Sequence, residues 1–257
     1  MVGKLLKRIY TVLMFAFLYA PIVVLVVFSF NDSKSTAKWE GFTFKWYHTL
    51  IENGYIMKSL YYTILVAVVS ALLATLIGTF AAFGIHYMKA WKQKVILNVN
   101  NIPILNPDIV TGVALMTLFV GMKLELGLMT MILAHVTFNI PYVILSVLPK
   151  LKQMSGDTLE AAMDLGATPW YAFRKVILPE IKPGIITGGL IAFTLSIDDF
   201  VISFFNAGNG VTNLSIAIYS MARRGIKPEI NALSTLMFIT VLIMLILINK
   251  RTKIEEI

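Results

Sequence analysis

Three acidic residues lie inside long apolar stretches of the sequence, Asp108 and the adjacent pair Asp198 and Asp199. A carboxylate is costly to place in hydrocarbon, so acidic residues in such stretches usually face a cavity or a partner and mark a pathway. No lysine or arginine occurs within residues 184–206 to balance the pair. A cation from outside the chain is therefore the expected counter-charge of Asp198 and Asp199.

Polar side chains continue around this pair at helical spacing. Residues three or four positions apart share one face of a helix. One such face carries Ser196, Asp199, Ser203 and Asn206, and a neighbouring face carries Thr187, Thr194 and Asp198. Rings that are able to contact alkyl chains or ammonium groups follow nearby, at Phe193, Phe200, Phe204 and Phe205. Ser196 and its stripe either line a pathway or join neighbouring helices through hydrogen bonds.

Asp108 directly follows Asn106 and Pro107, where a helix is expected to be broken or to begin. Its carboxylate either caps that helix or adds a charge to the pathway. Two aromatic residues are further pathway candidates. Trp46 either stacks over a cation in an outer vestibule or anchors the chain at the membrane interface, and the same alternatives hold for Tyr19.

The residues needed for several other kinds of chemistry are missing from the sequence. There is no cysteine, which excludes thiol catalysis and thiolate metal sites. No GxxxxGK(S/T) phosphate loop, HExxH, CxxC or GxSxG motif occurs. The histidines His48, His86 and His135 have no metal-ligand spacing, and His135 is expected to pack between helices. We therefore expect neither catalytic residues nor a metal or cofactor in this chain.

The composition places these residues in a membrane. Hydrophobic residues make up 58% of the 257, only 14% are charged, and the mean hydropathy is +0.79. Soluble domains average about 25% charged residues. A helix needs roughly 20 apolar residues to cross the bilayer core. Six runs meet this length, at 9–30, 59–85, 102–121, 126–148, 184–206 and 230–249. The sequence predicts an all-α membrane protein with a single six-helix domain over residues 1–257.

The basic residues indicate the orientation of these spans. Six spans put both termini on one side of the membrane. With the termini inside, 14 of the 22 lysines and arginines fall on inner segments and the other 8 on outer ones. The positive-inside rule therefore favours cytoplasmic termini. The basic residues are scattered among apolar runs, so the high isoelectric point, about 9.5, does not indicate nucleic-acid binding.

The longest inner segment, residues 149–183, has the pattern of a helix–turn–helix. Gly166 is expected to end the first helix, and Thr168 with Pro169 to begin the second. A break is expected at Leu178–Pro179. Small residues on the first helix leave room for the close approach of another protein's backbone, and they are Ala161, Ala162 and Gly166.

Glu160-Ala161-Ala162, followed by Gly166 and by Ile177-Leu178-Pro179, resembles the EAA signature of the permease subunits of ABC importers. The resemblance extends over the whole chain. It is greatest to permeases of the spermidine/putrescine type at residues 106–112, 196–200 and 218–221.

This resemblance implies a type I ABC importer permease in the bacterial inner membrane, with 149–183 as the cytoplasmic coupling loop. Glu160, Ala161, Ala162, Gly166 and Pro179 would then contact a separate ATPase dimer, which would bind ATP and Mg²⁺. A second permease, an extracytoplasmic binding protein and a polyamine substrate are further implied partners. The alternatives are another solute (ferric iron, an anion or an amino acid) and an ion-coupled secondary carrier, in which the aspartates would relay the ion.

Overall fold

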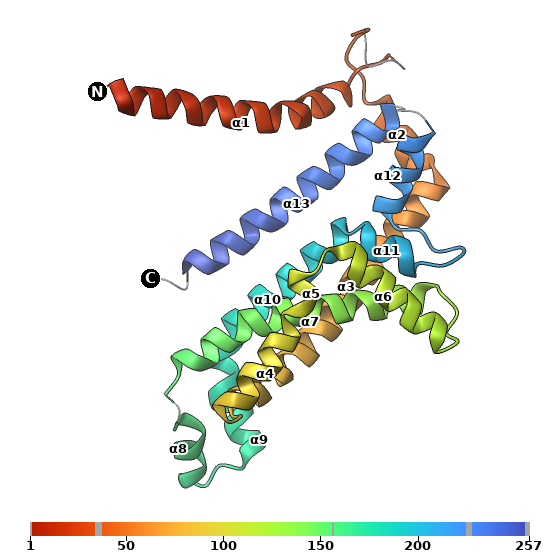
Figure 1. The fold of residues 1–257 in the computed structure, drawn as a ribbon. Helices are drawn as coiled ribbons and strands as arrows, with labels where there is room; N and C mark the ends of the chain where they lie inside the picture. The colour runs from red at the N-terminus through yellow and green to blue at the C-terminus, as the bar shows by residue number, and fades with distance from the viewer. Residues whose placement is uncertain (1, 34–37, 156, 225–227, 255–257) are drawn as a thin grey trace. The chain divides into compact units, whose positions relative to one another are not determined.

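The computed structural model describes residues 2–33, 38–155, 157–224 and 228–254, and these are almost entirely helical. Figure 1 shows, in chain order, α1 (Val2–Phe28), α2 (Lys45–Glu52), α3 (Gly54–His86), α4 (Ala90–Asn100), α5 (Ile102–Leu105), α6 (Asp108–Gly121), α7 (Leu128–Gln153), α8 (Thr158–Asp164), α9 (Pro169–Ala172), the π-helical turn η1 (Phe173–Ile177), α10 (Leu178–Asp198), α11 (Val201–Asn206), α12 (Leu214–Arg223) and α13 (Pro228–Ile254). Within these ranges the structure contains no β-strand, only an isolated bridge between Asn31 and Phe42.

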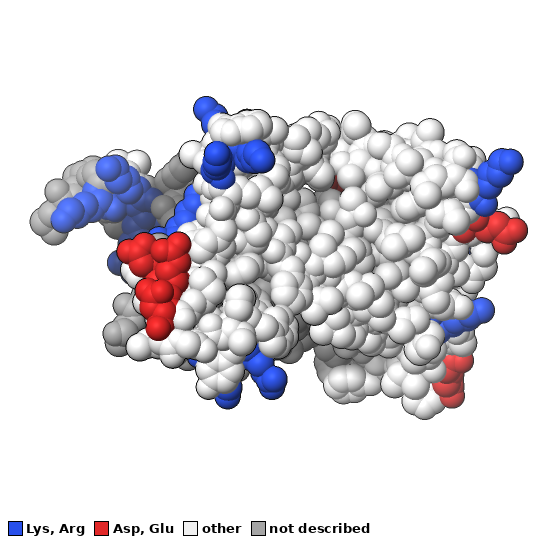
Figure 2. Space-filling view, turned by 90° about the horizontal axis from the view of Figure 1, so that it is seen from below, with Lys and Arg blue, Asp and Glu red and all other residues white. Residues whose placement is uncertain are grey.

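Five of the described helices are long and apolar enough to cross a membrane. They are Leu6–Phe28, Gly54–His86, Leu128–Gln153, Pro169–Asp198 and Pro228–Ile246. The pair Ala90–Leu105 and Asp108–Gly121 adds a sixth crossing when it is counted as one span. The face seen in Figure 2 carries a broad area without charged side chains, as lipid contact requires. The expected all-α membrane fold is confirmed. Lys34 and Lys227, both counted on outer segments, lie outside the described residues.

The third span differs from the expected helix over 102–121. It begins earlier, at Ala90, and it is bent by 106° where α5 and α6 meet. Asn106 and Pro107 both have extended backbones there, with ψ angles of 146° and 138°. A proline ring disfavours helical geometry in the residue before it, and Pro107 has no N–H to donate. The break therefore follows from the local sequence.

The fifth span also differs from the expected single helix over 184–206. α10 ends at Asp198, the backbone of Asp199 is extended with a ψ of 127°, and α11 resumes at Val201. The side chain of Asp199 accepts hydrogen bonds from the backbone N–H groups of Ile202 and Ser203. Such local bonds offer the backbone an alternative to the helical ladder, so the helix stops and restarts at this residue.

The expected break at Leu178–Pro179 is wrong. α9, η1 and α10 follow one another as one apolar helical stretch, Pro169–Asp198. A proline inside an α-helix clashes with the carbonyl four residues earlier. Here the π-helical turn Phe173–Ile177 directly precedes α10 and widens the backbone at that position, which accommodates Pro179 in the first turn of α10.

The described residues divide into two compact units, one of residues 59–216 and 241–257 and the other of residues 1–58 and 217–240. The first unit is built around α7 and α10, which pack side by side (Figure 1). A Cβ at Gly184 would lie 2.6 Å from the carbonyl oxygen of Ser146, so only glycine permits this approach. Small residues serve helix packing in membranes in this way. Val143, Val147 and Ile181 are fully buried in the core of the unit.

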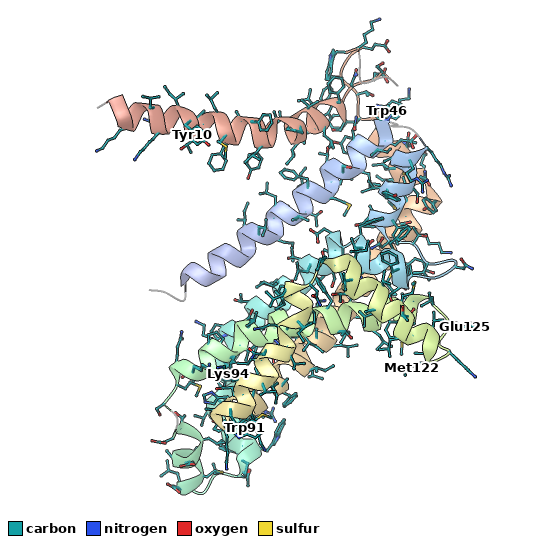
Figure 3. The ribbon with its side chains drawn as sticks, in the orientation of Figure 1. Tyr10, Trp46, Trp91, Lys94, Met122 and Glu125 are labelled. Atoms are coloured by element: carbon teal, nitrogen blue, oxygen red, sulfur yellow. The ribbon has the colours of Figure 1, made fainter. Side chains whose placement is uncertain are left out.

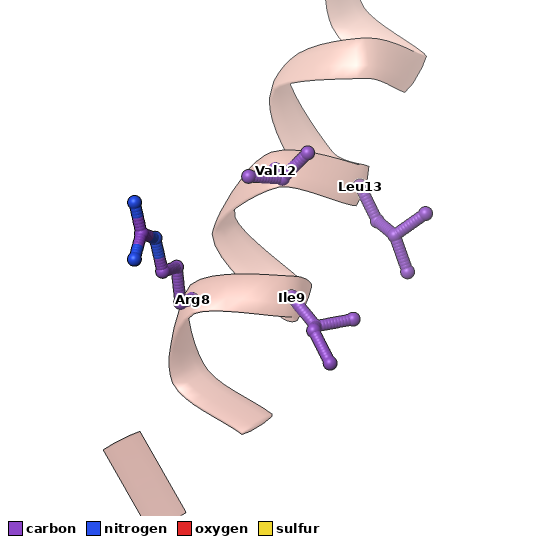
Figure 4. Close-up of a pocket in the computed structure, with 4 residues that line it drawn as sticks. All are labelled: Arg8, Ile9, Val12 and Leu13. Carbon is purple, nitrogen blue, oxygen red and sulfur yellow. The ribbon is translucent and has the colours of Figure 1, made fainter. Parts of the chain in front are cut away.

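The unit of residues 1–58 and 217–240 contains α1 and α2. No residue in the apolar part of α1 is buried. A shallow hollow of about 310 Å³ runs along this helix between Arg8, Ile9, Val12 and Leu13 (Figure 4). All four residues belong to one helix, so the hollow does not form a binding site. α2 is amphipathic and buries Trp46 and Leu50.

Candidate functional site

The broken third and fifth spans contact each other through α6 and α11, both within residues 59–216. A Cβ at Gly112 would lie 3.3 Å from the Phe205 ring, so the two helices approach closely there. Each break carries acidic side chains. Asp108 is the first residue of α6, Asp198 is the last residue of α10, and Asp199 follows in the break. Interrupted helices at membrane depth expose backbone dipoles that bind ions in transporters.

Asp198 is exposed on this chain, at the C-terminal end of α10. Helix C-termini carry a partial negative charge, so its carboxylate adds to a region that already attracts cations. The hydroxyl of Ser215 donates to the backbone carbonyl of Asp198 at 3.2 Å, which ties the start of α12 to this helix end. The side chain and the helix end together form a cation-attracting position.

Asp199 has a different environment, and its side chain is only 8% exposed. Its Oδ1 accepts from the N–H of Ile202 at 3.1 Å and its Oδ2 from the N–H of Ser203 at 2.7 Å. Nε2 of His135, in α7, lies 3.5 Å from Oδ2. Another helix thus supplies a polar partner for Asp199, which the sequence did not predict, and an external cation as the counter-charge of the pair stays a prediction.

Asp108 is exposed in the first turn of α6. No side-chain hydrogen bond caps this helix, because the residue that precedes it is Pro107. The capping alternative is therefore not observed, and the residue is exposed.

Ser196 is buried and joins three helices. Its hydroxyl lies 3.1 Å from that of Ser70 in α3 and accepts a 2.7 Å hydrogen bond from Nδ2 of Asn139 in α7. The structure thus places Ser196 in helix packing, away from any open surface. Two rings lie beside the aspartates in sequence: Phe200 directly precedes α11 and Phe204 lies within it. Their centroids are 5.3 Å apart. Phe193 packs against the core of α7 and α10 instead.

Trp46 and Tyr19 belong to the unit of residues 1–58 and 217–240. The indole of Trp46 is only 5% exposed, and its Nε1 donates to the carbonyl oxygen of Asn31 at 2.7 Å. This side chain stabilises the outer segment and is not open to a vestibule on this chain. Tyr19 is half exposed on α1, and its ring stacks on that of Phe15 with centroids 6.2 Å apart.

The inner segment presents α8 and α9 at one end of α7 and α10 (Figure 1). Two backbone bonds close α8, from Gly166 N–H to Met163 O and from Ala167 N–H to Ala162 O. These are the bonds of a Schellman motif. Gly166 has a φ of +89°, and nothing lies within 4 Å of the position that a Cβ would take. Its expected role as the helix end is confirmed.

Glu160, Ala161, Gly166 and Pro179 are exposed, while Ala162 is half-buried. The opposite side of the segment is anchored by Phe173, whose ring contacts those of Phe80 and Phe83 in α3 at 5.7 and 4.9 Å between centroids. The segment therefore has one face fixed to the bundle and one face open to a partner. Nearby, Lys150, Gln153, Met154, Glu180 and Pro183 line a polar hollow of about 340 Å³.

Among the described residues, no group of three or more histidine, cysteine or acidic side chains is placed to hold a metal ion. Residues 74–250 match the family described as "Binding-protein-dependent transport system inner membrane component". The chain belongs to this family. It is thus a multi-pass membrane component of a transport system, and its membrane spans and broken helices are to be understood in that setting.

Named relatives of this transport component are polyamine permeases. It is 37% identical over 246 residues to the "Spermidine/putrescine transport system permease protein PotC" of Escherichia coli (strain K12), with 96% of this chain and 93% of that protein covered. It is 40% identical over 229 residues to the "Putrescine transport system permease protein PotI" of the same organism, with 86% and 82% covered.

Solved structures share the fold of this transport component at lower identity. A bacterial ABC transporter involved in the import of the acidic polysaccharide alginate matches with a TM-score of 0.72 at 16% identity, covering 98% of this chain and 95% of that one. The MetNI methionine ABC transporter, in an inward-facing conformation, matches with a TM-score of 0.63 at 21% identity, covering 76% and 93%. These likenesses establish the type I ABC importer permease fold.

Sequence reasoning missed the polar partners of the aspartate pair. His135 was expected to pack between helices, and it is buried there, but its bond to α11 was not predicted and Asn213 was not singled out. Nδ2 of Asn213 donates to Ser203 Oγ and to the carbonyl of Asp199, and His135 lies 2.9 Å from the same hydroxyl. A histidine inside an apolar span is itself a signal of such a role, but its partner is 68 positions away along the chain.

Proposed function

We propose that this chain is the permease subunit of an ATP-driven, binding-protein-dependent importer of polyamines, and that it forms half of the translocation pathway. The observation that carries the proposal is the exposed carboxylate of Asp198 at the C-terminal end of α10, beside the second broken span. A polyamine is a flexible apolar chain with two or more ammonium groups. It therefore fits a path that offers carboxylates and ring faces together.

Cargo contact is assigned to the open side chains at the two breaks. Asp108 and Asp198 supply negative charge, and Phe200 and Phe204 supply rings. Ser196 and Asp199 act from within the packed helices, by holding the breaks in place. Tyr19 offers a half-exposed ring on α1 and is proposed as a contact in the assembled transporter, whereas Trp46 supports the outer segment.

The open face of α8 is proposed as the docking surface for a separate ATPase dimer. Glu160, Ala161 and Gly166 are exposed there, and the absent side chain of Gly166 permits close backbone approach. ATP and Mg²⁺ would be bound by that ATPase, since this sequence has no phosphate-binding loop. The remaining partners are a second permease subunit and an extracytoplasmic binding protein.

The positive-inside rule supports an orientation in the bacterial inner membrane with both termini and α8 on the cytoplasmic side. The helical stretch from Pro169 to Asp198 then connects the ATPase side directly to the aspartate pair. At 1.5 Å per residue its 30 residues span about 45 Å. Closure of the ATPase would displace this stretch at one end and change access to Asp198 at the other, which is the movement that alternating access requires.

Reconstitution into vesicles tests the proposal. The chain copurified with its ATPase, partner permease and binding protein is expected to take up radiolabelled spermidine only when ATP is supplied. The purified chain alone is expected to bind no ATP. Uptake by the lone chain under a proton gradient would identify an ion-coupled carrier instead, and uptake of an anion but not of spermidine would reject the polyamine assignment.

A further inference from the structure

His135 is completely buried, and the hydrogen-bonding contact of its ring is directed at α11. Its Nε2 lies 2.9 Å from Ser203 Oγ and 3.5 Å from Asp199 Oδ2. The other ring nitrogen, Nδ1, has no hydrogen-bond partner among the described residues. A buried polar group is expensive unless it is paired, so the Nε2 contacts are what offset the burial of this ring.

Asp199 is held by more than His135. Its two carboxylate oxygens accept the N–H groups of Ile202 and Ser203, which are otherwise unpaired at the start of α11. Asn213 bonds to the Asp199 carbonyl and to Ser203 Oγ. Both carboxylate oxygens thus accept hydrogen bonds within the chain, and the side chain is only 8% exposed.

The neighbouring carboxylate has the opposite environment. Asp198 is exposed, and among the described residues no hydrogen bond or ion pair joins its side chain to another residue, while its backbone carbonyl accepts from Ser215. The two aspartates are adjacent and of the same residue type, but their environments differ. The Asp198 residue is exposed, whereas the Asp199 side chain is buried among hydrogen-bond donors.

We propose that His135 is a positioning residue of the cation pathway. It holds Asp199 on the first turn of α11, which keeps the break between α10 and α11 in place and leaves Asp198 as the carboxylate of the pair that meets the cationic cargo. The cargo part of this inference rests on the proposed function, whereas the link between His135 and Asp199 does not.

Thermal unfolding of the detergent-solubilised transporter complex, without the binding protein, separates the positioning role of His135 and Asp199 from the cargo-binding role of Asp198. Its Tm is measured without cargo and with saturating spermidine for His135→Leu, Asp199→Asn, Asp198→Asn and the double His135→Leu, Asp199→Asn variant. Thr137→Val is the matched control, because the Thr137 hydroxyl, two residues from His135, bonds only to the Leu133 carbonyl of its own helix.

The variants at His135 and Asp199 are expected to lower the cargo-free Tm by about 5–10 °C, as the loss of one partner of a buried pair does. The Tm loss in the double variant should be smaller than the sum of the two single losses, since both single substitutions remove the same contact between His135 and Asp199. These variants should reduce but not abolish the Tm increase that spermidine causes, because the break loses a contact that holds it while the Asp198 carboxylate remains. Asp198→Asn should keep the cargo-free Tm and lose the increase, and the control should match the wild type.

Three outcomes would overturn the proposal: additive Tm losses at His135 and Asp199, a wild-type Tm in His135→Leu, or loss of the spermidine response in Asp199→Asn. If His135→Leu does not assemble, His135→Gln replaces it, because its amide N–H reaches the position of Nε2. A loss in His135→Gln as large as that of a His135→Ala variant would show that ring volume matters and reject the hydrogen-bond role. If the wild type shows no response to spermidine, the polyamine function fails, while the cargo-free measurements still decide the His135–Asp199 link.

Discussion

Nδ2 of Asn206 donates a 3.2 Å hydrogen bond to the backbone carbonyl of Gly112, although the two residues are 94 positions apart. This bond joins α11 to α6, the two short helices that follow the breaks in the third and fifth spans. The same amide also bonds to the Ile202 carbonyl within α11. The helix that begins at Asp108 and the helix that follows the Asp198–Asp199 pair are therefore joined by a hydrogen bond.

Gly112→Val should separate these two helices. The first added carbon would lie 3.3 Å from the Phe205 ring and 3.4 Å from the Val201 carbonyl, and valine adds two further carbons to it. We expect a loss of about 1–3 kcal/mol in the free energy of unfolding, seen as a lower Tm of the purified complex. Gly112→Ala is the control and should cost much less, because the Phe205 ring is able to shift slightly. Equal stability of the valine variant would contradict the close packing of α6 and α11.

Ser196→Ala should act through stability and not through cargo contact. The substitution leaves Nδ2 of Asn139 buried without its acceptor and removes one of the two hydrogen-bond partners of Ser70. A buried polar group left unpaired costs about 1–3 kcal/mol, measurable as a fall in Tm. Thr194→Val is the matched control, since the Thr194 hydroxyl bonds only to the Leu190 carbonyl of its own helix. A Ser196→Ala variant with wild-type Tm and reduced spermidine binding would instead assign this serine to the pathway.

Gly166→Trp and Glu160→Lys should impair docking of the ATPase while leaving membrane insertion normal. Glu160 lies on α8 and Gly166 in the turn that follows it, both are exposed, and a bulky or reversed-charge side chain changes the contact surface. The expected result is loss of the ATPase on copurification and loss of ATP-dependent uptake. Gly166→Asn separates backbone strain from surface shape, because asparagine tolerates positive φ better than other residues. Unimpaired transport in Gly166→Trp would show that this face does not dock the ATPase.

Asp198→Asn removes a charge from the pathway while it preserves shape and hydrogen bonding. Loss of a charge-assisted hydrogen bond to an ammonium group corresponds to about 1.5–3 kcal/mol. Uptake of spermidine should fall about 10- to 100-fold if that loss acts on the rate-limiting step. ATPase activity stimulated by the binding protein should be retained better than uptake, since the coupling segment is unchanged.

Glu125→Gln is the control for Asp198→Asn. Glu125 lies beyond the far end of α6 from the break (Figure 3) and is exposed, so loss of its charge should leave uptake unchanged. The double Asp198→Asn, Asp199→Asn variant tests the pair as a whole. Near-normal polyamine uptake in that variant would refute the assignment of a cation path to these residues.

The amino-acid sequence by itself determined the membrane class, the approximate spans and the helix–turn–helix that follows Met154. Hydrophobic runs of sufficient length need no knowledge of tertiary contacts, because the bilayer acts on each helix separately. The turn at Gly166 and the break before Asp108 were equally local. Glycine accepts a positive φ, and Pro107 disrupts helical geometry in its own neighbourhood.

Tertiary structure alone decided which polar residues are open and which are occupied. Helical periodicity put Ser196 and Asp199 on one stripe, but it carried no information about the helix that faces that stripe. The partners of Ser196 lie 126 and 57 positions away, at Ser70 and Asn139. Asp199 and Asp198 are neighbours of the same residue type, and only the packing of α7 against α11 buries one beside His135 and leaves the other exposed. Pairing between buried groups depends on which helix faces meet, and that is a property of the whole fold.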